Sequence, residues 1–201
     1  MITAYNYALS LSALSWAALR IFKIPNDERF TLVNVSIIAF HLQIAYLFFA
    51  RTPITNRIPL RVLGIGILSL AAGGMILKIA PPLNHWPVVN SFCFLISTTW
   101  VVFSFAFLGK SFAVLPVARE LVVRGPYSLV RHPAYLGELG MLTSAASAAF
   151  LANPVFALLF FGMAVVAIAW RINEEESVLT SGLEYDAYRS KVTYRLLPFV
   201  W

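Results

Sequence analysis

The sequence predicts an all-α membrane protein, a polytopic bundle of about five to six transmembrane helices that includes a C-terminal helical hairpin. Of its 201 residues, 60% are hydrophobic and only 12% are charged. A soluble domain of this size has too little interior to bury so many apolar side chains. The few charges also leave long uncharged runs, and about 20 such residues cross the hydrocarbon layer once.

Four of these runs are long enough for one crossing each. The first has no basic segment before its apolar residues, so we expect a retained helix and not a cleaved signal peptide. The four runs are Met1–Leu19, Phe30–Ala50, Val62–Ala80 and Val88–Gly109. The third contains one charge, Lys78, which can snorkel at its end.

The fifth run, Leu139–Trp170, has 32 uncharged residues, too many for one ordinary crossing. Asn153 and Pro154 lie near its middle, where proline disfavours a continuous helix and asparagine suits a turn. We therefore expect a helical hairpin. Its two halves are short, so they should tilt or take up neighbouring loop residues.

The basic residues predict the orientation. Eleven of the fifteen Lys and Arg fall in 51–61, in 110–138 and in the tail from Arg171, which lie on one side if the helices alternate. Basic loops stay cytoplasmic, so we expect both termini and these segments in the cytoplasm. The net charge of +6 then reflects membrane topology and does not indicate nucleic acid as a partner.

Polar chemistry is concentrated after the fourth run. We therefore divide the chain into N-terminal transmembrane helices, residues 1–109, facing lipid or substrate, and a second region, residues 110–201. The single cysteine, Cys93, allows neither an intrachain disulfide nor a cysteine metal cluster, and we expect no metal site. For His41 and Gln43, within the second run, interhelical hydrogen bonds are favoured over a substrate site.

The first polar segment runs from Gly125 to Glu138. Pro133 suits the first turn of the hairpin helix, with His132 at its cap. Such a helix start would favour an anionic group beside Arg131. Tyr127 and Tyr135 offer stacking faces or hydroxyl donors. The alternative is a basic turn with aromatic anchors at the membrane surface.

The second polar segment begins at Arg171 and contains three adjacent carboxylates, Glu174, Glu175 and Glu176. Adjacent carboxylates repel one another and need solvent or cationic partners. Either this is a solvated helix face, or one or two of the glutamates turn back toward Arg131 and His132.

The pattern GPY-x3-RHP-x-Y-x-G spans Gly125 to Gly137. After the hairpin it is followed by a Glu-Glu pair, a Y-x2-Y at Tyr185 and Tyr188, and an R-x2-P that begins at Arg195. This order resembles the isoprenylcysteine carboxyl methyltransferase family and its relatives, which include phospholipid methyltransferases. The likeness covers the chain from about Leu108 onward.

The resemblance implies an integral membrane methyltransferase that uses S-adenosyl-L-methionine, bound in a cytoplasmic pocket built from the two polar segments. The acceptor implied is lipophilic or prenylated, best a prenylcysteine-type carboxylate, and enters from the lipid bilayer. It assigns catalytic roles to Arg131 and Glu175. Which two glutamates form the family pair is open, and Glu175 belongs to either alignment. The cofactor-binding residues implied are Tyr127, Arg131, His132, Tyr135, Gly137, Glu174 and Glu175.

Three alternatives remain. A phospholipid or amine N-methyltransferase would share every motif. An NADPH-dependent sterol-type reductase carries a similar RHP-x-Y-x-G signature, although asparagine is then expected where this chain has Ala134. A non-catalytic membrane module is the third, but His41 and Lys78 are almost the only ionisable groups in the spans, which disfavours transport. The acceptor and the oligomeric state stay open.

Overall fold

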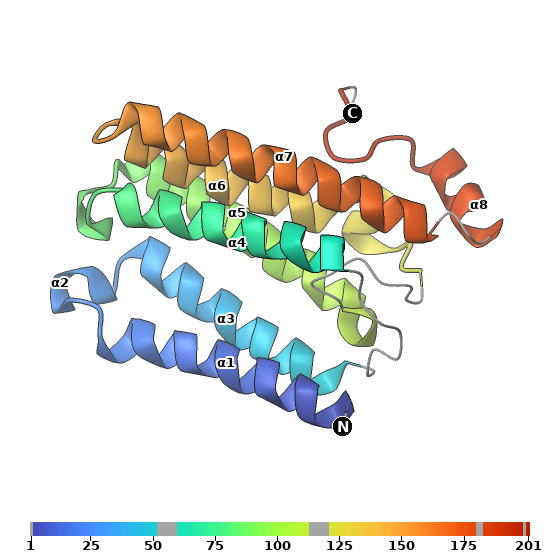
Figure 1. Cartoon of the computed structure of the whole chain (residues 1–201), viewed down its shortest axis with the longest axis horizontal. Helices are drawn as coiled ribbons and strands as arrows, with labels where there is room; N and C mark the ends of the chain where they lie inside the picture. Colours follow the sequence, from blue (N-terminus) through green and yellow to red (C-terminus); the bar gives the residue numbers. More distant parts are fainter. Residues whose placement is uncertain (1, 52–59, 113–120, 180–182, 199) are drawn as a thin grey trace.

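A computed structural model describes residues 2–51, 60–112, 121–179, 183–198 and 200–201, and within these residues all regular structure is helical. Six long helices lie side by side in a bundle (Figure 1). They are α1 (Ile2–Phe22), α3 (Leu32–Ala50), α4 (Leu60–Ile79), α5 (Val88–Leu108), α6 (Pro133–Phe150) and α7 (Pro154–Leu179). The predicted fold class, a polytopic all-α bundle, is confirmed.

Shorter helices occupy the connections. The α-helix α2 (Asn26–Arg29) lies between α1 and α3 and was not expected from the apolar runs. Helix α3 begins after Thr31, whose hydroxyl accepts a hydrogen bond from the Asn34 N–H at 3.3 Å. The others are the 3₁₀ helices η1 (Leu83–His85), η2 (Gly109–Ser111) and η3 (Gly125–Ser128), and the α-helix α8 (Leu183–Lys191).

The C-terminal hairpin has the predicted break and longer arms. The chain turns between α6 and α7, where the Asn153 N–H donates to the Ala149 carbonyl at 2.8 Å. Helix α6 has 18 residues and α7 has 26, because each extends into the polar segment beside it. The two arms thus gain the length that their uncharged residues alone lack.

Three helices of the described chain are both long and apolar enough to cross a membrane. They are α3, α5 together with η2, and α7. A shorter apolar stretch of α4, Gly64–Ile79, falls below that length. Five to six crossings therefore stay a prediction.

Small side chains let the C-terminal helices pack closely. Ala148 and Ala149 of α6 and Ala164 of α7 are fully buried, which fits the packing predicted from the small residues of α6. Where α6 meets α5, a Cβ on Gly137 would lie 2.5 Å from Val101 Cγ2 and 2.9 Å from the Ser97 carbonyl oxygen. The glycine of the RHP motif is thus required for close helix packing.

Of the two polar residues in α3, His41 and Gln43, only one makes the predicted interhelical hydrogen bond. Gln43 Nε2 donates to the Val102 carbonyl of α5 at 2.6 Å, which confirms an interhelical hydrogen bond. His41 Nδ1 instead lies 2.7 Å from the Ile37 carbonyl of its own helix. An interhelical bond for His41 was wrong, because one helical turn back the backbone already offers an acceptor.

Both ends of the chain lie at the same end of the bundle, together with α8 (Figure 1). Helix α2 and the turn of the α6–α7 hairpin lie at the opposite end. The polar segments around Arg131 and Glu175 therefore share one end with the termini.

Candidate active site at one end of the bundle

The loop that carries Arg131 and His132 is shaped before it reaches α6. Gly125 opens η3 with φ of +62°, a conformation that favours glycine, and the Phe107 ring occupies the space that a Cβ would need. Pro133 is the first residue of α6 and His132 is its N-cap, as predicted. The loop thus delivers both motif side chains at the start of α6.

The C-terminal tail is hydrogen-bonded to this loop through its backbone. The Arg131 N–H donates to the Tyr194 carbonyl and the His132 N–H donates to the Arg195 carbonyl, both at 2.9 Å. The Arg131 guanidinium adds bonds from Nη1 to the Val192 carbonyl at 2.8 Å and from the same nitrogen to Thr193 at 2.6 Å. Arg131 therefore holds the tail against the motif.

One carboxylate, that of Glu176, contacts two arginine side chains and one histidine side chain. Its Oε1 lies 2.9 Å from Arg131 Nε and 3.2 Å from His132 Nε2, and its Oε2 lies 2.7 Å from Arg195 Nη2. We call Arg131, His132, Glu176 and Arg195 the Glu176 cluster. Arg131 and Glu176 are almost fully buried, with side chains 4% and 6% exposed.

The other two glutamates face different partners, because successive residues of a helix point about 100° apart. The Glu175 carboxylate lies 4.0 Å from His132 Nδ1 with its side chain 35% exposed. Glu174 lies 3.4 Å from Arg61 of α4 and accepts a 3.3 Å bond from Trp170 Nε1. Glu175 is thus the glutamate that is both beside the cluster and accessible.

The motif tyrosines differ in their surroundings. Tyr127 is buried, and its carbonyl accepts a 2.6 Å bond from the Tyr188 hydroxyl of α8. Burial raises the pKa of Tyr188 above its usual value, so the hydroxyl stays protonated as a donor. Tyr135 lies with its ring centre 5.7 Å from that of His132. Tyr127 therefore helps to hold α8 against the RHP loop, whereas Tyr135 lies beside the Glu176 cluster.

Residues without a predicted role form a second charged group next to the first. Arg171 Nη1 lies 3.1 Å from Glu138 Oε1, and the Arg171 Cζ lies 4.7 Å from the centre of the Tyr135 ring. Ser69 of α4 donates to Glu138 Oε1 at 3.1 Å. We call Ser69, Glu138 and Arg171 the Glu138 cluster. The only signal in the sequence for this cluster is that Glu138 directly precedes and Arg171 directly follows the uncharged run Leu139–Trp170.

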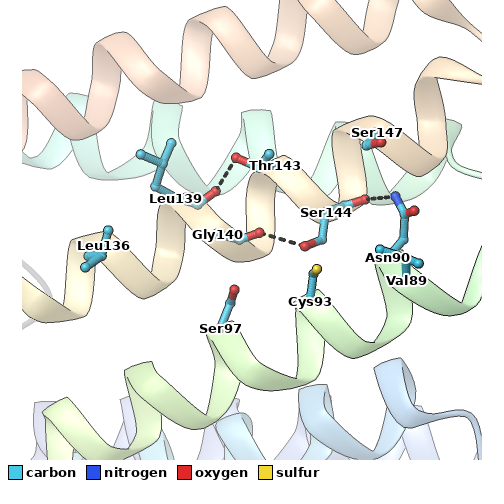
Figure 2. A pocket seen from close by; sticks show the side chains of 10 residues that line it. All are labelled: Val89, Asn90, Cys93, Ser97, Leu136, Leu139, Gly140, Thr143, Ser144 and Ser147. Carbon is cyan, nitrogen blue, oxygen red and sulfur yellow. Dashed lines mark hydrogen bonds between the residues drawn. The ribbon is translucent and has the colours of Figure 1, made fainter. Parts of the chain in front are cut away.

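A groove of about 410 Å³ lies between α5 and α6, and Figure 2 shows its lining. Its wall is partly polar, but the Thr143 and Ser144 hydroxyls donate to carbonyls one turn back in α6. Asn90 Nδ2 of α5 donates to the Ser144 carbonyl at 3.0 Å and so joins the two helices. The lining residues are Val89, Asn90, Cys93, Ser97, Leu136, Leu139, Gly140, Thr143, Ser144 and Ser147.

An apolar helix bundle that places buried arginine, histidine and glutamate side chains at one end is a polytopic membrane protein with a polar site beside its apolar core. Residues 88–181 match the isoprenylcysteine carboxyl methyltransferase (ICMT) family. This match confirms the resemblance stated from the motifs.

A second comparison finds the Delta(14)-sterol reductase TM7SF2 of Mus musculus. It is 33% identical over 85 residues, which are 41% of this chain and 20% of the reductase. The chain thus spans only about a fifth of the curated relative's length.

Proposed function

We propose that the protein is an integral membrane methyltransferase that uses S-adenosyl-L-methionine and methylates a lipophilic acceptor, best a prenylcysteine-type carboxylate. The observation that carries the proposal is the meeting of the RHP loop with the acidic turn of α7 around Glu176. The ICMT family match over residues 88–181 supports the reaction class.

The polar groups at this end of the bundle fit such a cofactor. Two arginines are already paired with Glu176, so the accessible carboxylate of Glu175 adds negative charge that would suit an ammonium group or ribose hydroxyls. Tyr135 would offer an aromatic face beside it. Glu174, Tyr127, His132 and Gly137 complete the proposed binding set, with Tyr127 and Gly137 acting through packing.

When bound, the cofactor supplies an electrophilic methyl group on a sulfonium. The chain's own task is then to position an acceptor and to exclude water. A carboxylate acceptor is ionised at neutral pH and needs no general base. For an amine acceptor, His132 or Glu175 would take the proton. In this proposal Glu175 contacts the ligand, whereas Arg131 acts by holding the tail and Glu176 in place.

We propose that the acceptor approaches through the groove between α5 and α6. The groove begins at Leu136, within the RHP motif, and extends along both helices to Val89. Thr143 is exposed at its wall, so Thr143→Trp should fill the groove. We expect a higher KM for the acceptor and an unchanged Kd for S-adenosylhomocysteine; an unchanged acceptor KM would contradict this route.

The proposed function is tested by ligand-dependent stability and by product formation in nanodiscs. A ligand that binds only the folded state raises the Tm, so S-adenosylmethionine and S-adenosylhomocysteine should stabilise the protein. Methyl-labelled cofactor offered with prenylcysteine, aminolipid, fatty-acid and thiol acceptors should label one of them. Glu175→Gln should weaken cofactor binding at least tenfold without lowering the Tm of the free protein.

A sterol-type reductase is the second candidate, because the likeness to the Delta(14)-sterol reductase covers 41% of this chain. Ala134 stands where asparagine is expected for that class. A Tm increase with NADPH alone, and none with S-adenosylhomocysteine, would replace the methyltransferase by the reductase.

We also propose that the Glu176 cluster and both termini face the cytoplasm. Ser128 in η3 and Asn84 in η1 are both exposed. Cysteines placed there in a Cys93→Ser background should react with an impermeant reagent from opposite sides of the membrane, with residue 128 cytoplasmic. Reaction of both from one side would contradict the predicted number of crossings between them.

A further inference from the structure

Helix α4 lies outside the family match, yet it contributes to the charged groups beside the candidate site. Ser69 of α4 donates to Glu138 Oε1 and accepts a 3.3 Å bond from Arg171 Nη1. The same Arg171 nitrogen lies 3.1 and 3.2 Å from the two Glu138 oxygens. Three helices, α4, α6 and α7, therefore meet at one ion pair.

Helix packing alone does not explain this ion pair. The Arg171 side chain is only 11% exposed, whereas that of Glu138 is 32% exposed. The buried guanidinium therefore pays a desolvation cost, and apolar residues of similar volume often pack at least as well. Around it, the same three helices are held by apolar side chains such as Ala72, Ala145 and Ile168. A charged pair at this position points to a role in the site next to it.

The contact of Arg171 with Tyr135 supplies that role. The guanidinium carbon lies 4.7 Å from the centre of the Tyr135 ring, within cation–π distance. Another neighbour of Tyr135 is His132, whose Nε2 lies 3.2 Å from Glu176 Oε1. Glu138 and Ser69 thus orient the Arg171 guanidinium, and the guanidinium in turn orients the Tyr135 ring.

We infer that the Glu138 cluster is a positioning unit that fixes Tyr135 beside His132 and Glu175. Arg171, Glu138 and Ser69 act through Tyr135 and do not contact the ligand. The unit links α4 to the site, so the N-terminal half of the chain influences cofactor binding. The statement about the cofactor rests on the proposed function, whereas the statement about the ring does not.

Fluorine NMR of protein labelled with 3-fluorotyrosine tests the position of the ring in the free protein. The Tyr135 resonance is assigned by its loss in Tyr135→Phe. Arg171→Met and Glu138→Gln should both shift or broaden it, and the two changes together should do no more than Arg171→Met alone. Arg171→Lys keeps the charge but loses the planar guanidinium, so it should not restore the parent resonance.

Cofactor affinity is the second measurement. Arg171→Met and Glu138→Gln should each weaken S-adenosylhomocysteine binding about tenfold by calorimetry, and Ser69→Ala about threefold. Lys78→Met, at the exposed far end of α4, is the matched control and should leave affinity and resonance unchanged.

An unchanged Tyr135 resonance in both variants would overturn the inference, even if the Tm fell, because the pair would then serve stability only. A different result would separate the two proposals. If S-adenosylhomocysteine leaves the Tyr135 resonance of the parent protein unchanged, the proposed function is contradicted. If Arg171→Met and Glu138→Gln still shift that resonance, the positioning unit is retained.

Discussion

The α1–α3 pair and the α6–α7 hairpin are both antiparallel helix pairs of one bundle, but different interactions hold them. Between α1 and α3 the Ser10 hydroxyl donates to the Ala45 carbonyl at 2.8 Å, and Arg51 Nε donates to Asn6 Oδ1 at 3.0 Å. The α6–α7 hairpin instead carries two carboxylate–arginine groups at its open end. Single polar contacts are enough to join helices in lipid, so clustered charges there indicate a function beyond packing.

The largest effect on stability is expected from Glu176→Gln, which would remove the ion pairs at the open end of the α6–α7 hairpin. Arg131 and Arg195 would lose their shared anion while Arg131 stays buried. Removal of one partner of a buried ion pair costs about 3–5 kcal/mol. We expect a strongly lowered Tm and faster proteolysis of the tail after α8.

The control for this prediction is Glu184→Gln, because Glu184 is exposed on α8. Its Tm should stay within about 1 °C of the parent, as for an ordinary surface change. A Glu176→Gln protein as stable as the Glu184→Gln protein would mean that the cluster does not hold the tail.

A smaller effect is expected where α6 meets α5. Gly137→Ala would place a methyl group 2.5 Å from Val101 Cγ2, and overpacking of this kind costs about 1–3 kcal/mol. The free energy of unfolding should fall by that amount in denaturant titrations. Gly162→Ala is the matched control in α7, because beyond the neighbouring backbone of its own helix no atom lies within 4 Å of the added Cβ.

Gly162→Ala should be neutral or stabilise the helix by about 0.5–1 kcal/mol. If both alanine variants behave alike, Gly137 is not a packing requirement, and its presence in the motif needs another explanation.

The smallest effect is expected in the α1–α3 pair. Ser10→Ala removes one interhelical hydrogen bond, and such bonds average about 0.6 kcal/mol within membranes. We expect a small loss of stability and an unchanged Tm increase with S-adenosylhomocysteine. Ser15→Ala is the control, because the Ser15 hydroxyl donates to Leu11 in its own helix. Loss of the cofactor response in Ser10→Ala would show that the two regions are coupled.

The amino-acid order alone predicts the six long helices and the break between α6 and α7. Uncharged runs report where a helix can lie in lipid, and a residue pair such as Asn153-Pro154 acts on its own turn. The position of Pro133 at the start of α6 is equally local, since proline's fixed φ and missing N–H suit that position. Among the six long helices only the lengths changed, because α6 and α7 extend into polar residues that hydropathy assigns to loops.

The partners of the charged side chains were decided by the tertiary structure. Arg131 and Glu176 lie 45 residues apart, and no local signal distinguishes Glu176 from Glu175. A rotation of α7 by one residue, about 100°, would present a different carboxylate to the RHP loop. The meeting of Ser69, Glu138 and Arg171 likewise depends on how α4, α6 and α7 are rotated against one another, and packing of their small side chains sets those rotations.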